Sequence, residues 1–248
     1  MKVVGLIPVR LESSRLPEKA IKDICGLPMI IHVLKRTQMA KSLAQVFVVT
    51  DSSQIANLVR LHDGNVIMTG AHHRTGSDRI AEAALKIDAD IIVNVQGDEA
   101  LVNPEHIDMG VQGLIDSDAE VSLLVTEFNE TNSPSNIKAV LNKKNEIMYL
   151  SRADIPSIAR SATDCMYKAY HVVTFRKEFL LAYAKMEQTP LELVEFNEYL
   201  RILENGYKIQ GIKVESKAIS VDTSEDLDFV KSQMEHDDIF PSYWQKKV

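Results

Sequence analysis

The chain has 248 residues, 45% of them hydrophobic, and a formal net charge of −7 at pH 7, which suits one large α/β domain or two modest ones. The acidic balance disfavours nucleic acid as a partner, because most of the surface would repel a polyanion. The isolated Cys25 and Cys165 disfavour a disulfide framework or a zinc ribbon, and the lack of a long apolar run or a leader cleavage site predicts a cytoplasmic protein without membrane insertion.

Strand-like and helical segments alternate through the first hundred residues. Apolar, β-branched runs predict strands at residues 2–9, 44–50, 64–69 and 90–96. Between these runs, Pro28 predicts the first position of one helix and Ser77 predicts the N-cap of another. Near-continuous apolar strands are typical of a parallel sheet that helices cover on both faces. The sequence therefore predicts an α/β fold.

The alternation changes after residue 103. Asn103 predicts the N-cap of a helix over residues 103–115, and a strand is expected over residues 120–128. Residues 130–176 contain strand-like pieces separated by polar linkers. This change of pattern predicts that the chain leaves the first sheet to build a second lobe.

Two further helices are predicted near the end of the chain. Residues 189–206 predict one helix that stops at Gly206, with an apolar face made of Leu193, Phe196, Leu200 and Leu203. Thr223 and Asp226 have the spacing of a capping box. The helix that follows this box is expected to bury Leu227, Val230 and Met234.

Three cations, Arg10, Arg15 and Lys19, follow the first predicted strand in the segment IPVRLESSRLPEK. In an open parallel sheet this loop lies at the carboxyl edge of the strands, where ligands bind. The cations are therefore candidates for an anion site, and a solvated basic loop is the alternative. Neither the P-loop pattern nor the dinucleotide-binding glycine pattern occurs in the sequence, so side chains must supply much of the charge.

Two carboxylates are candidate ligands of a divalent cation. Asp98 follows the strand that ends at Gln96, and Asp222 stands at the entrance of the last predicted helix. Mg²⁺ in proteins is commonly held by one or two carboxylates together with phosphate oxygens. The alternatives are a turn-forming role for Asp98 and a helix-start role for Asp222.

The segment MTGAHHRTGSDR predicts a pocket rich in backbone N–H groups. Gly70, Gly76 and Ser77 precede a helix, and N–H groups at such a position suit an anion or the edge of a base. His72 and His73 are not expected to bind a metal ion, because neighbours in sequence rarely point at one ion.

Eight segments occur in a characteristic order: IPVRLESSRLPEKAI, GLPMIIHVL, VVTD, HRTGSDRIAE, NVQGDE, SRADIP, PLELVEFNEYLRIL and VDTSEDL. Together they resemble the CMP-Kdo synthetases, the 3-deoxy-manno-octulosonate cytidylyltransferases, over nearly the whole chain. The resemblance implies a Rossmann-like nucleotidyltransferase fold with a mostly parallel sheet covered by helices. Within a single domain it implies a nucleotide-binding part at about 1–128 and 216–236, and a smaller sugar-binding and dimerisation lobe at about 130–215.

The resemblance further implies an Mg²⁺-dependent enzyme that activates a 3-deoxy-octulosonic acid with CTP, for lipopolysaccharide core synthesis. Attack by the sugar's anomeric hydroxyl on the α-phosphorus would release pyrophosphate and leave a CMP-sugar, and the enzyme would be a homodimer. The implied nucleotide-binding residues are Arg10, Arg15, Lys19, Gly76, Ser77, Arg79 and Gln96. The implied catalytic residues are Arg10, Lys19 and Asp98. The implied Mg²⁺ ligands are Asp98 and Asp222, and the implied sugar-binding residues are Arg152, Asp154, His171, Glu195, Glu198 and Tyr199.

The chain departs from the family mainly where the sugar would bind. The family pattern R-H-x-G-x-Y reads KAYHVV at residues 168–173, Asp154 is an additional carboxylate, and Tyr199 replaces a frequent Gln. Buried polar groups that lose their partners cost roughly 1–3 kcal/mol each, so these changes predict a changed sugar. The hypothesis is 8-amino-3,8-dideoxy-manno-octulosonate, with Asp154 or His171 receiving its ammonium group; ordinary Kdo is the alternative.

Other classes of protein fit the sequence less well. A nucleotide-binding regulator without turnover would have no need to keep Lys19, Asp98 and Asp222 together. A GT-A glycosyltransferase needs an acidic D-x-D motif after a strand, whereas the segment DAD at 88–90 precedes one. A dehydrogenase is disfavoured by the missing glycine pattern.

Overall fold

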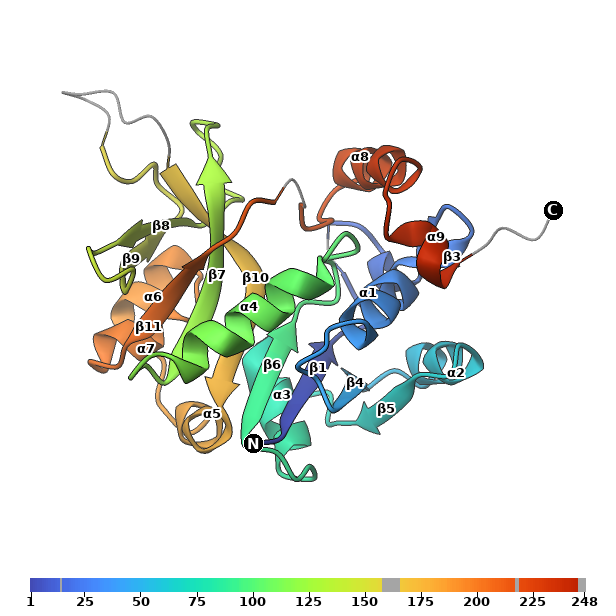
Figure 1. The fold of residues 1–248 in the computed structure, drawn as a ribbon, viewed down its shortest axis with the longest axis horizontal. Coiled ribbons are helices and arrows are strands. Elements are labelled where there is room, and N and C mark those ends of the chain that lie inside the picture. Colours follow the sequence, from blue (N-terminus) through green and yellow to red (C-terminus); the bar gives the residue numbers. More distant parts are fainter. Residues whose placement is uncertain (14, 158–165, 217–218, 245–248) are drawn as a thin grey trace. The chain divides into compact units, whose positions relative to one another are not determined.

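The computed structural model describes residues 1–13, 15–157, 166–216 and 219–244. The chain forms two compact units, the first from Met1–Asp108 with Lys217–Val248 and the second from Met109–Ser216. Figure 1 labels the helices and strands of both. The described part of the chain contains no helix with the length and apolar character of a membrane span. Cys165 lies outside the described residues.

A parallel sheet in the order β6-β1-β4-β5 forms the centre of unit 1. Its strands β1 and β6 are buried along their whole length, as a sheet covered on both faces requires. This arrangement confirms the predicted α/β class and the four predicted strands. The strands are β1 (Val3–Pro8), β4 (Gln45–Thr50), β5 (Asn65–Met68) and β6 (Ile91–Val95).

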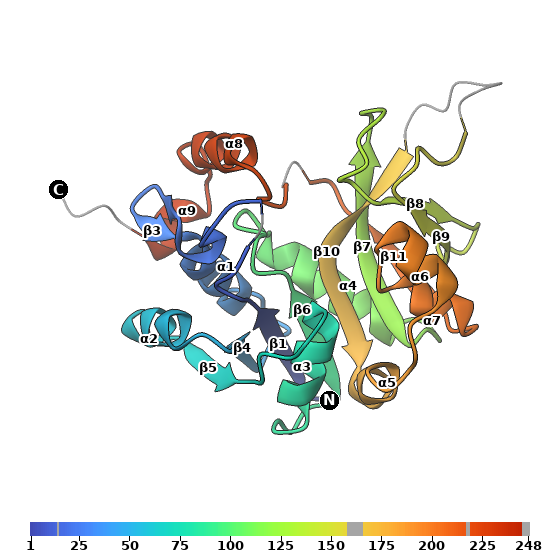
Figure 2. The ribbon, with the colours of Figure 1, turned by 180° about the vertical axis from the view of Figure 1, so that it is seen from behind.

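The helices α1 (Met29–Gln38) and α3 (Gly76–Ala84) lie on opposite faces of this sheet, as Figures 1 and 2 show from the two sides. The helix α2 (Ser53–Leu61) packs beside β4 and β5. Pro28 is the N-cap of α1 and not its first helical residue, so the helix begins one residue later than predicted.

The predicted cap of α3 was wrong. Thr75, not Ser77, is its N-cap: the backbone there is extended, and the Thr75 hydroxyl accepts a hydrogen bond from the Asp78 N–H at 3.1 Å. Ser77 lies fully buried in the first turn. Both residues carry a hydroxyl, so composition alone does not tell which one caps the helix.

The chain between β1 and α1 forms a short 3-10 helix, η1 (Lys19–Ile21), and a small hairpin of β2 (Asp23–Ile24) and β3 (Leu27–Pro28). The hairpin turn places Cys25 at φ 50° and Gly26 at φ 94°, in the left-handed region that suits glycine. The Cys25 thiol contacts the Lys231 carbonyl oxygen at 3.6 Å.

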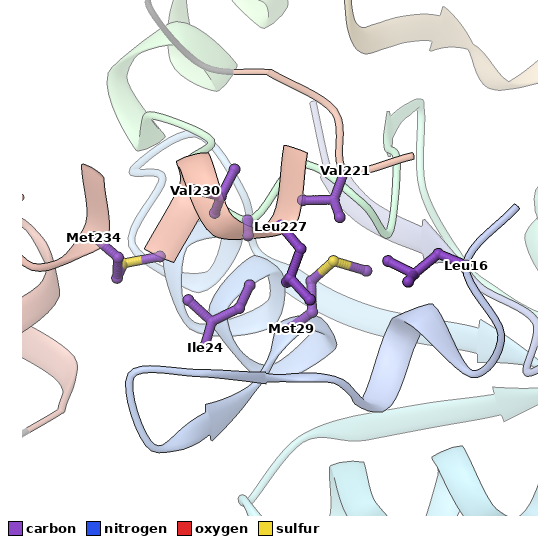
Figure 3. Packing of buried hydrophobic residues seen from close by; sticks show 8 residues of the cluster. Leu16, Ile24, Met29, Val221, Leu227, Val230 and Met234 are labelled. Carbon is purple, nitrogen blue, oxygen red and sulfur yellow. The ribbon is translucent and has the colours of Figure 1, made fainter. Parts of the chain in front are cut away.

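The last long helix, α8 (Ser224–Met234), begins at the predicted capping box and returns to unit 1. Its buried side chains Leu227, Val230 and Met234 confirm the predicted apolar face. Figure 3 shows them packed with apolar residues of the loop after β1, the hairpin and α1: Leu16, Ile24 and Met29. Burial of each such side chain stabilises the fold by about 1.5–3 kcal/mol, so this cluster holds together segments some 200 residues apart in sequence.

The segment after α8 packs on α1 through α9 (Phe240–Tyr243), which lies beside α1 in both views (Figures 1 and 2). The Tyr243 hydroxyl contacts His32 Nδ1 at 2.8 Å and accepts a hydrogen bond from Arg36 Nε at 3.2 Å. Arg36 is almost completely buried and pairs with Asp237. The sequence offered no interpretation of this segment beyond packing, and its residues 245–248 lie outside the described part.

Unit 2 is built on a mixed sheet. Its strand β7 (Val121–Phe128) pairs in parallel with β11 (Ile209–Lys213) and antiparallel with β10 (Met166–Arg176). The pairing of β10 with β7 is irregular between Tyr170 and Val173, which places His171 in a bulge. Unit 2 also contains α5 (Lys177–Tyr183) and the antiparallel β8 (Lys138–Leu141) and β9 (Ile147–Ser151).

The predicted helix over residues 103–115 is α4 (Pro104–Ile115), and the side chain of Asn103 accepts a hydrogen bond from the Glu105 N–H at 3.0 Å. This contact agrees with the predicted N-cap. The helix crosses the boundary between the two units at residue 108.

The single helix predicted over residues 189–206 was wrong. The structure has α6 (Pro190–Glu195) and α7 (Leu200–Glu204), separated at Phe196, whose φ is 48°. The predicted apolar face is divided accordingly, because Phe196 is 82% exposed whereas Leu200 is buried. The Arg152 guanidinium donates to the carbonyl oxygens of Glu195 at 2.8 Å and Phe196 at 3.2 Å. A contact from a distant residue thus supports the break, which helical periodicity does not reveal.

Candidate functional site

Unit 1 contains a cavity of about 280 Å³ at the carboxyl edge of its parallel sheet. Three loops line it: the one after β1, the one before α3 and the one after β6, together with Asp222. The predicted site residues that meet there are Arg10, Arg15, Lys19, Gly76, Arg79, Gln96, Asp98 and Asp222. Ser77, which was also predicted for this site, is not among the described residues that line the cavity. Its hydroxyl is buried and has no hydrogen-bond partner among the described residues.

Two glycines let these loops approach one another closely. A Cβ at Gly97 would stand 3.0 Å from the Pro8 carbonyl oxygen, and a Cβ at Gly76 would stand 3.2 Å from Gln96 Nε2. Larger residues would push the loops apart. The glycines therefore shape the cavity through steric fit.

The cations of the first loop converge on two carboxylates. Lys19 Nζ lies 2.7 Å from Asp98 Oδ2, 3.0 Å from Asp222 Oδ1 and 2.8 Å from the Val221 carbonyl oxygen. Arg15 Nη2 lies 2.9 Å from the same Asp222 oxygen. Arg10 is exposed. The sequence predicted both groups of residues but not their direct contact.

These contacts set the electrostatics of the site. Burial alone would lower the pKa of Lys19, but the charges of Asp98 and Asp222 and their hydrogen bonds outweigh it and raise that pKa. Lys19 is therefore fully charged at neutral pH.

Backbone contacts hold Asp98 and Asp222 in register. The Val221 N–H donates to the Asp98 carbonyl oxygen at 3.1 Å. The Asp226 carboxylate accepts from the Asp222 N–H at 3.0 Å and from the Thr223 N–H at 2.8 Å. The capping box of α8 thereby fixes the backbone that carries Asp222.

Arg79 lines the cavity while its guanidinium binds neighbouring protein groups. Its Nη1 donates to Thr69 Oγ1 at 2.8 Å, and its Nη2 lies 3.4 Å from Asp51 Oδ2. Neither Asp51 nor Thr69 was a predicted site residue. Their position directly after the strands β4 and β5, at the same sheet edge, is the signal that indicates them.

His72, His73 and Glu82 bring three possible metal-ligand atoms within 4.8 Å of one another. The sequence did not predict that these three side chains meet. Within the group, His73 Nε2 lies 2.6 Å from Glu82 Oε2, which also accepts the Gly70 N–H at 3.0 Å. The His73 hydrogen bond, followed by that of Gly70, lowers the pKa of Glu82 to about 2.

The predicted sugar-binding residues lie in unit 2, where Arg152 and Glu195 form one network. Glu195 accepts hydrogen bonds from the Ser151 hydroxyl at 2.7 Å and the Arg152 N–H at 2.8 Å. Burial would raise the pKa of Glu195, but hydrogen bonds from Arg152 and Ser151 outweigh it and lower that pKa. Arg152 itself supports the turn at Phe196.

Asp154 lies beside a buried lysine that the sequence analysis missed. Lys138 has no exposed side-chain surface and donates to the carbonyl oxygens of Ser133, Asn136 and Arg152 at 2.6–2.9 Å. Asp154 Oδ1 is 3.6 Å from Lys138 Nζ, and its Oδ2 accepts the Asn132 N–H at 2.8 Å. A lysine inside a strand carries no sequence signal that distinguishes this role from a surface position.

The other three predicted residues occupy different parts of unit 2. The Tyr183 hydroxyl donates to the Glu198 carbonyl oxygen at 2.8 Å, and Tyr199 is buried at 5% exposure. His171 is half-buried in the bulge of β10.

Comparisons with known proteins agree on one class. The profile of the family described as cytidylyltransferase matches residues 4–209. A 3-deoxy-manno-octulosonate cytidylyltransferase of Geobacter metallireducens is 40% identical, over 94% of this chain and 98% of that protein. A solved structure of CMP:2-keto-3-deoxy-manno-octonic acid synthetase in complex with CTP matches with a TM-score of 0.91 and 33% identity, over 95% of this chain and 99% of that one.

A more distant structure is similar in fold alone. The 4-diphosphocytidyl-2C-methyl-D-erythritol synthase of Anaerococcus prevotii has a TM-score of 0.63 at 14% identity, covering 94% of this chain and 96% of that one.

Proposed function

Because this chain belongs to the cytidylyltransferase family, we propose that it transfers CMP from CTP to a 3-deoxy-octulosonic acid and releases pyrophosphate. The observation that carries the proposal is the cavity of unit 1, which the three cations of the segment after β1 line together with the carboxylates Asp98 and Asp222. A triphosphate requires such local positive charge on a protein whose net charge is −7. The products would serve lipopolysaccharide synthesis in the cytoplasm.

The residues of the cavity fit Mg²⁺ as a cofactor. Asp98 and Asp222 already direct carboxylate oxygens at one cation, the Lys19 ammonium, and hard divalent ions prefer such oxygen ligands. These two aspartates would hold the ion, which when bound would neutralise charge on the phosphates. The donor set and its position beside the cationic loop support this assignment.

The side chains of the cavity would act mainly by binding and positioning. Arg10, Arg15 and Lys19 would attract the phosphates and stabilise the charge that develops on the departing pyrophosphate. The N-terminus of α3 at Gly76, together with Gln96, would contact the cytidine. Attack of the anomeric hydroxyl on the α-phosphorus forms one P–O bond and breaks the bond to pyrophosphate, so the reaction requires orientation rather than a covalent intermediate.

The test is pyrophosphate release from CTP with Mg²⁺ and a 3-deoxy-octulosonic acid. We expect release that depends on all three components, and its loss in Asp98→Asn. The matched control is Asp116→Asn, an exposed carboxylate of unit 2 outside the cavity. CTP binding without release with any sugar acid would contradict the proposal and favour a nucleotide-binding regulator.

For the sugar, we propose 8-amino-3,8-dideoxy-manno-octulosonate in preference to ordinary Kdo. Its ammonium group needs an acceptor, and unit 2 offers the Asp154 carboxylate and the His171 imidazole, both half-buried. Asp154 has its cation Lys138 only at 3.6 Å, beyond the range of a close ion pair, which leaves it capacity for a second cation.

The two sugars should be compared side by side in the same assay. We expect faster turnover of the amino sugar, and a loss of that preference in Asp154→Asn or His171→Gln, with CTP binding retained. Removal of a charge-assisted hydrogen bond should lower the preference by roughly tenfold, which corresponds to about 1.5 kcal/mol. A preference for Kdo in the unaltered protein would overturn this choice of sugar and leave the cytidylyltransferase proposal standing.

We also propose that the protein is a homodimer formed through unit 2. Four large apolar side chains on and directly after α6 are exposed: Leu191 by 38%, Leu193 by 53%, Val194 by 74% and Phe196 by 82%. On the neighbouring strand β9, Met148 is 62% exposed. An apolar group of this kind favours a protein interface, and a second copy of the chain is the occupant that the family resemblance implies.

Analytical ultracentrifugation tests this assembly. We expect a dimer for the unaltered protein and a monomer for Phe196→Glu, whereas Leu61→Glu, an exposed apolar residue of α2, should stay dimeric. A monomeric unaltered protein would refute the proposed assembly.

A further inference from the structure

The environment of Lys19 has the form of a cation site. The ammonium group has three N–H donors, and three oxygens accept them: Asp98 Oδ2, Asp222 Oδ1 and the Val221 carbonyl oxygen, at 2.7–3.0 Å. The side chain is only 17% exposed. A compact cation is therefore surrounded by the kind of oxygen that a hard metal ion prefers.

Charge in this niche is already balanced. Asp98 and Asp222 contribute two negative charges, and Lys19 and Arg15 contribute two positive charges at 2.7–3.0 Å from their oxygens. A divalent ion bound to the same oxygens would stand about 2.1 Å from them, in the space that the ammonium fills. Two cations so close together repel strongly, because the site is largely shielded from water.

We propose that Lys19 occupies the divalent-cation position in the nucleotide-free protein and is exchanged for the metal ion when the triphosphate binds. The phosphates offer Lys19 and Arg15 other anionic oxygens, and both side chains are long enough to turn from the carboxylates toward the cavity. The nucleotide thereby creates the metal site. This inference rests on the proposed nucleotide site and predicts that the metal ion enters with the nucleotide or after it.

Binding of Mn²⁺ to the nucleotide-free protein, measured by electron paramagnetic resonance, tests the exchange directly. We expect weak binding to the unaltered protein and at least about tenfold tighter binding to Lys19→Met, because the carboxylates lose their resident cation. The matched control is Arg10→Met, which removes the same charge from the same cavity but from a side chain that bonds neither aspartate. It should bind Mn²⁺ like the unaltered protein.

Two results of that titration would overturn the proposal. Equal tightening in Lys19→Met and Arg10→Met would show a general effect of charge, and no tightening in Lys19→Met would show that Lys19 does not compete. The double variant Lys19→Met with Asp98→Asn should lose the gain, which assigns the bound ion to these carboxylates.

Crystals of the unaltered protein give a second test that does not require any variant to fold. Soaked in MnCl₂ alone, they should show no anomalous peak between Asp98 and Asp222, with Lys19 in place. With MnCl₂ and CTP, and no sugar, they should show a peak there and Lys19 turned to the phosphates. A peak without CTP, or Lys19 unmoved beside a bound ion, would refute the exchange.

The exchange and the enzymatic function fail separately. Neither experiment contains a sugar or depends on turnover. If the protein releases pyrophosphate in the activity assay but binds Mn²⁺ at these carboxylates without CTP, the exchange is refuted and the enzymatic function stands. If it releases no pyrophosphate with any sugar acid, the enzymatic function is refuted.

Discussion

Each unit contains a lysine whose side chain is largely shielded from water, and the groups that surround these two lysines differ. Lys19 of unit 1 contacts two carboxylates and one carbonyl oxygen at the wall of a cavity. Lys138 of unit 2 is fully buried, contacts three carbonyl oxygens, and has Asp154 only at 3.6 Å. For Lys19 the carboxylates outweigh burial and raise the pKa, whereas burial of Lys138 outweighs Asp154 and lowers it.

The difference separates an exchangeable cation from a structural one. The two carboxylates that contact Lys19 offer oxygen ligands that another cation could bind in its place. The oxygens around Lys138 are carbonyl oxygens from residues 133, 136 and 152, and its side chain has no exposed surface. The first arrangement suits ligand binding, and the second fixes the loop that carries Asp154.

The largest expected effect is on catalysis, in Lys19→Met. We expect pyrophosphate release to fall by roughly 10²–10³-fold, because one preorganised positive charge on the phosphates is lost. The fold should persist, since the apolar cluster shown in Figure 3 does not include Lys19. Steady-state assays measure the rate of pyrophosphate release, and circular dichroism checks that the variant is folded. Activity within a factor of three of the unaltered protein would show that Lys19 is not a catalytic residue.

The next effect is on stability, in Lys138→Met. Three carbonyl oxygens would lose their buried donor and Asp154 its nearby cation, so we expect the free energy of unfolding to fall by about 3 kcal/mol. Urea denaturation measures this change. CTP binding by the folded variant should be retained. If instead Lys138→Met kept its stability and lost CTP binding, the contrast between the two lysines would be wrong.

A third buried group, His32, tests whether the lack of a carboxylate partner is what lets burial lower the pKa of a basic side chain. His32 is fully buried, and its Nε2 donates to the Ile24 carbonyl oxygen at 2.8 Å while its Nδ1 accepts from Tyr243. Burial, aided by the nearby Arg36 charge, lowers its pKa to about 4. The unfolded chain takes up this proton near pH 6.5, so the stabilising contribution is complete above that pH and is lost as the pH falls toward 4.

Between about pH 7.5 and 5 this difference should lower the free energy of unfolding by about 2 kcal/mol. Urea denaturation at several pH values measures the slope. His32→Gln should flatten it, even though the variant is less stable at neutral pH. An unchanged slope in the variant would assign the acid sensitivity to other groups.

The smallest effect is expected for Lys208→Met. Lys208 contacts Asp118 at 2.7 Å and Glu146 at 3.3 Å, but all three lie at the surface, where water screens the pairs. We expect no resolvable change in the urea midpoint at physiological salt. This variant also serves as the control for Lys138→Met, because each removes one lysine of unit 2.

The sequence predicted more of the structure of unit 1 than of unit 2. Arg15, Lys19, Asp98 and Asp222 were found because each follows a recognisable strand or precedes a capped helix, and parallel topology brings such positions to one edge. The break at Phe196 and the burial of Lys138 were missed, since both depend on contacts between residues distant in sequence. The choice of Thr75 over Ser77 depended on one backbone conformation. Roles of single residues toward the sugar stay predictions.

The order of the two units along the chain has a consequence for synthesis on the ribosome. Unit 2 is continuous, whereas unit 1 needs residues on both sides of it, and Asp222 and α8 are made after unit 2. During translation the first 108 residues can form their parallel sheet, but Leu16, Ile24 and Met29 have no α8 to pack against. The cavity of unit 1 therefore lacks Asp222 while unit 2 emerges. On the proposed function, we expect a nascent chain to gain its affinity for CTP only late, after α8 docks.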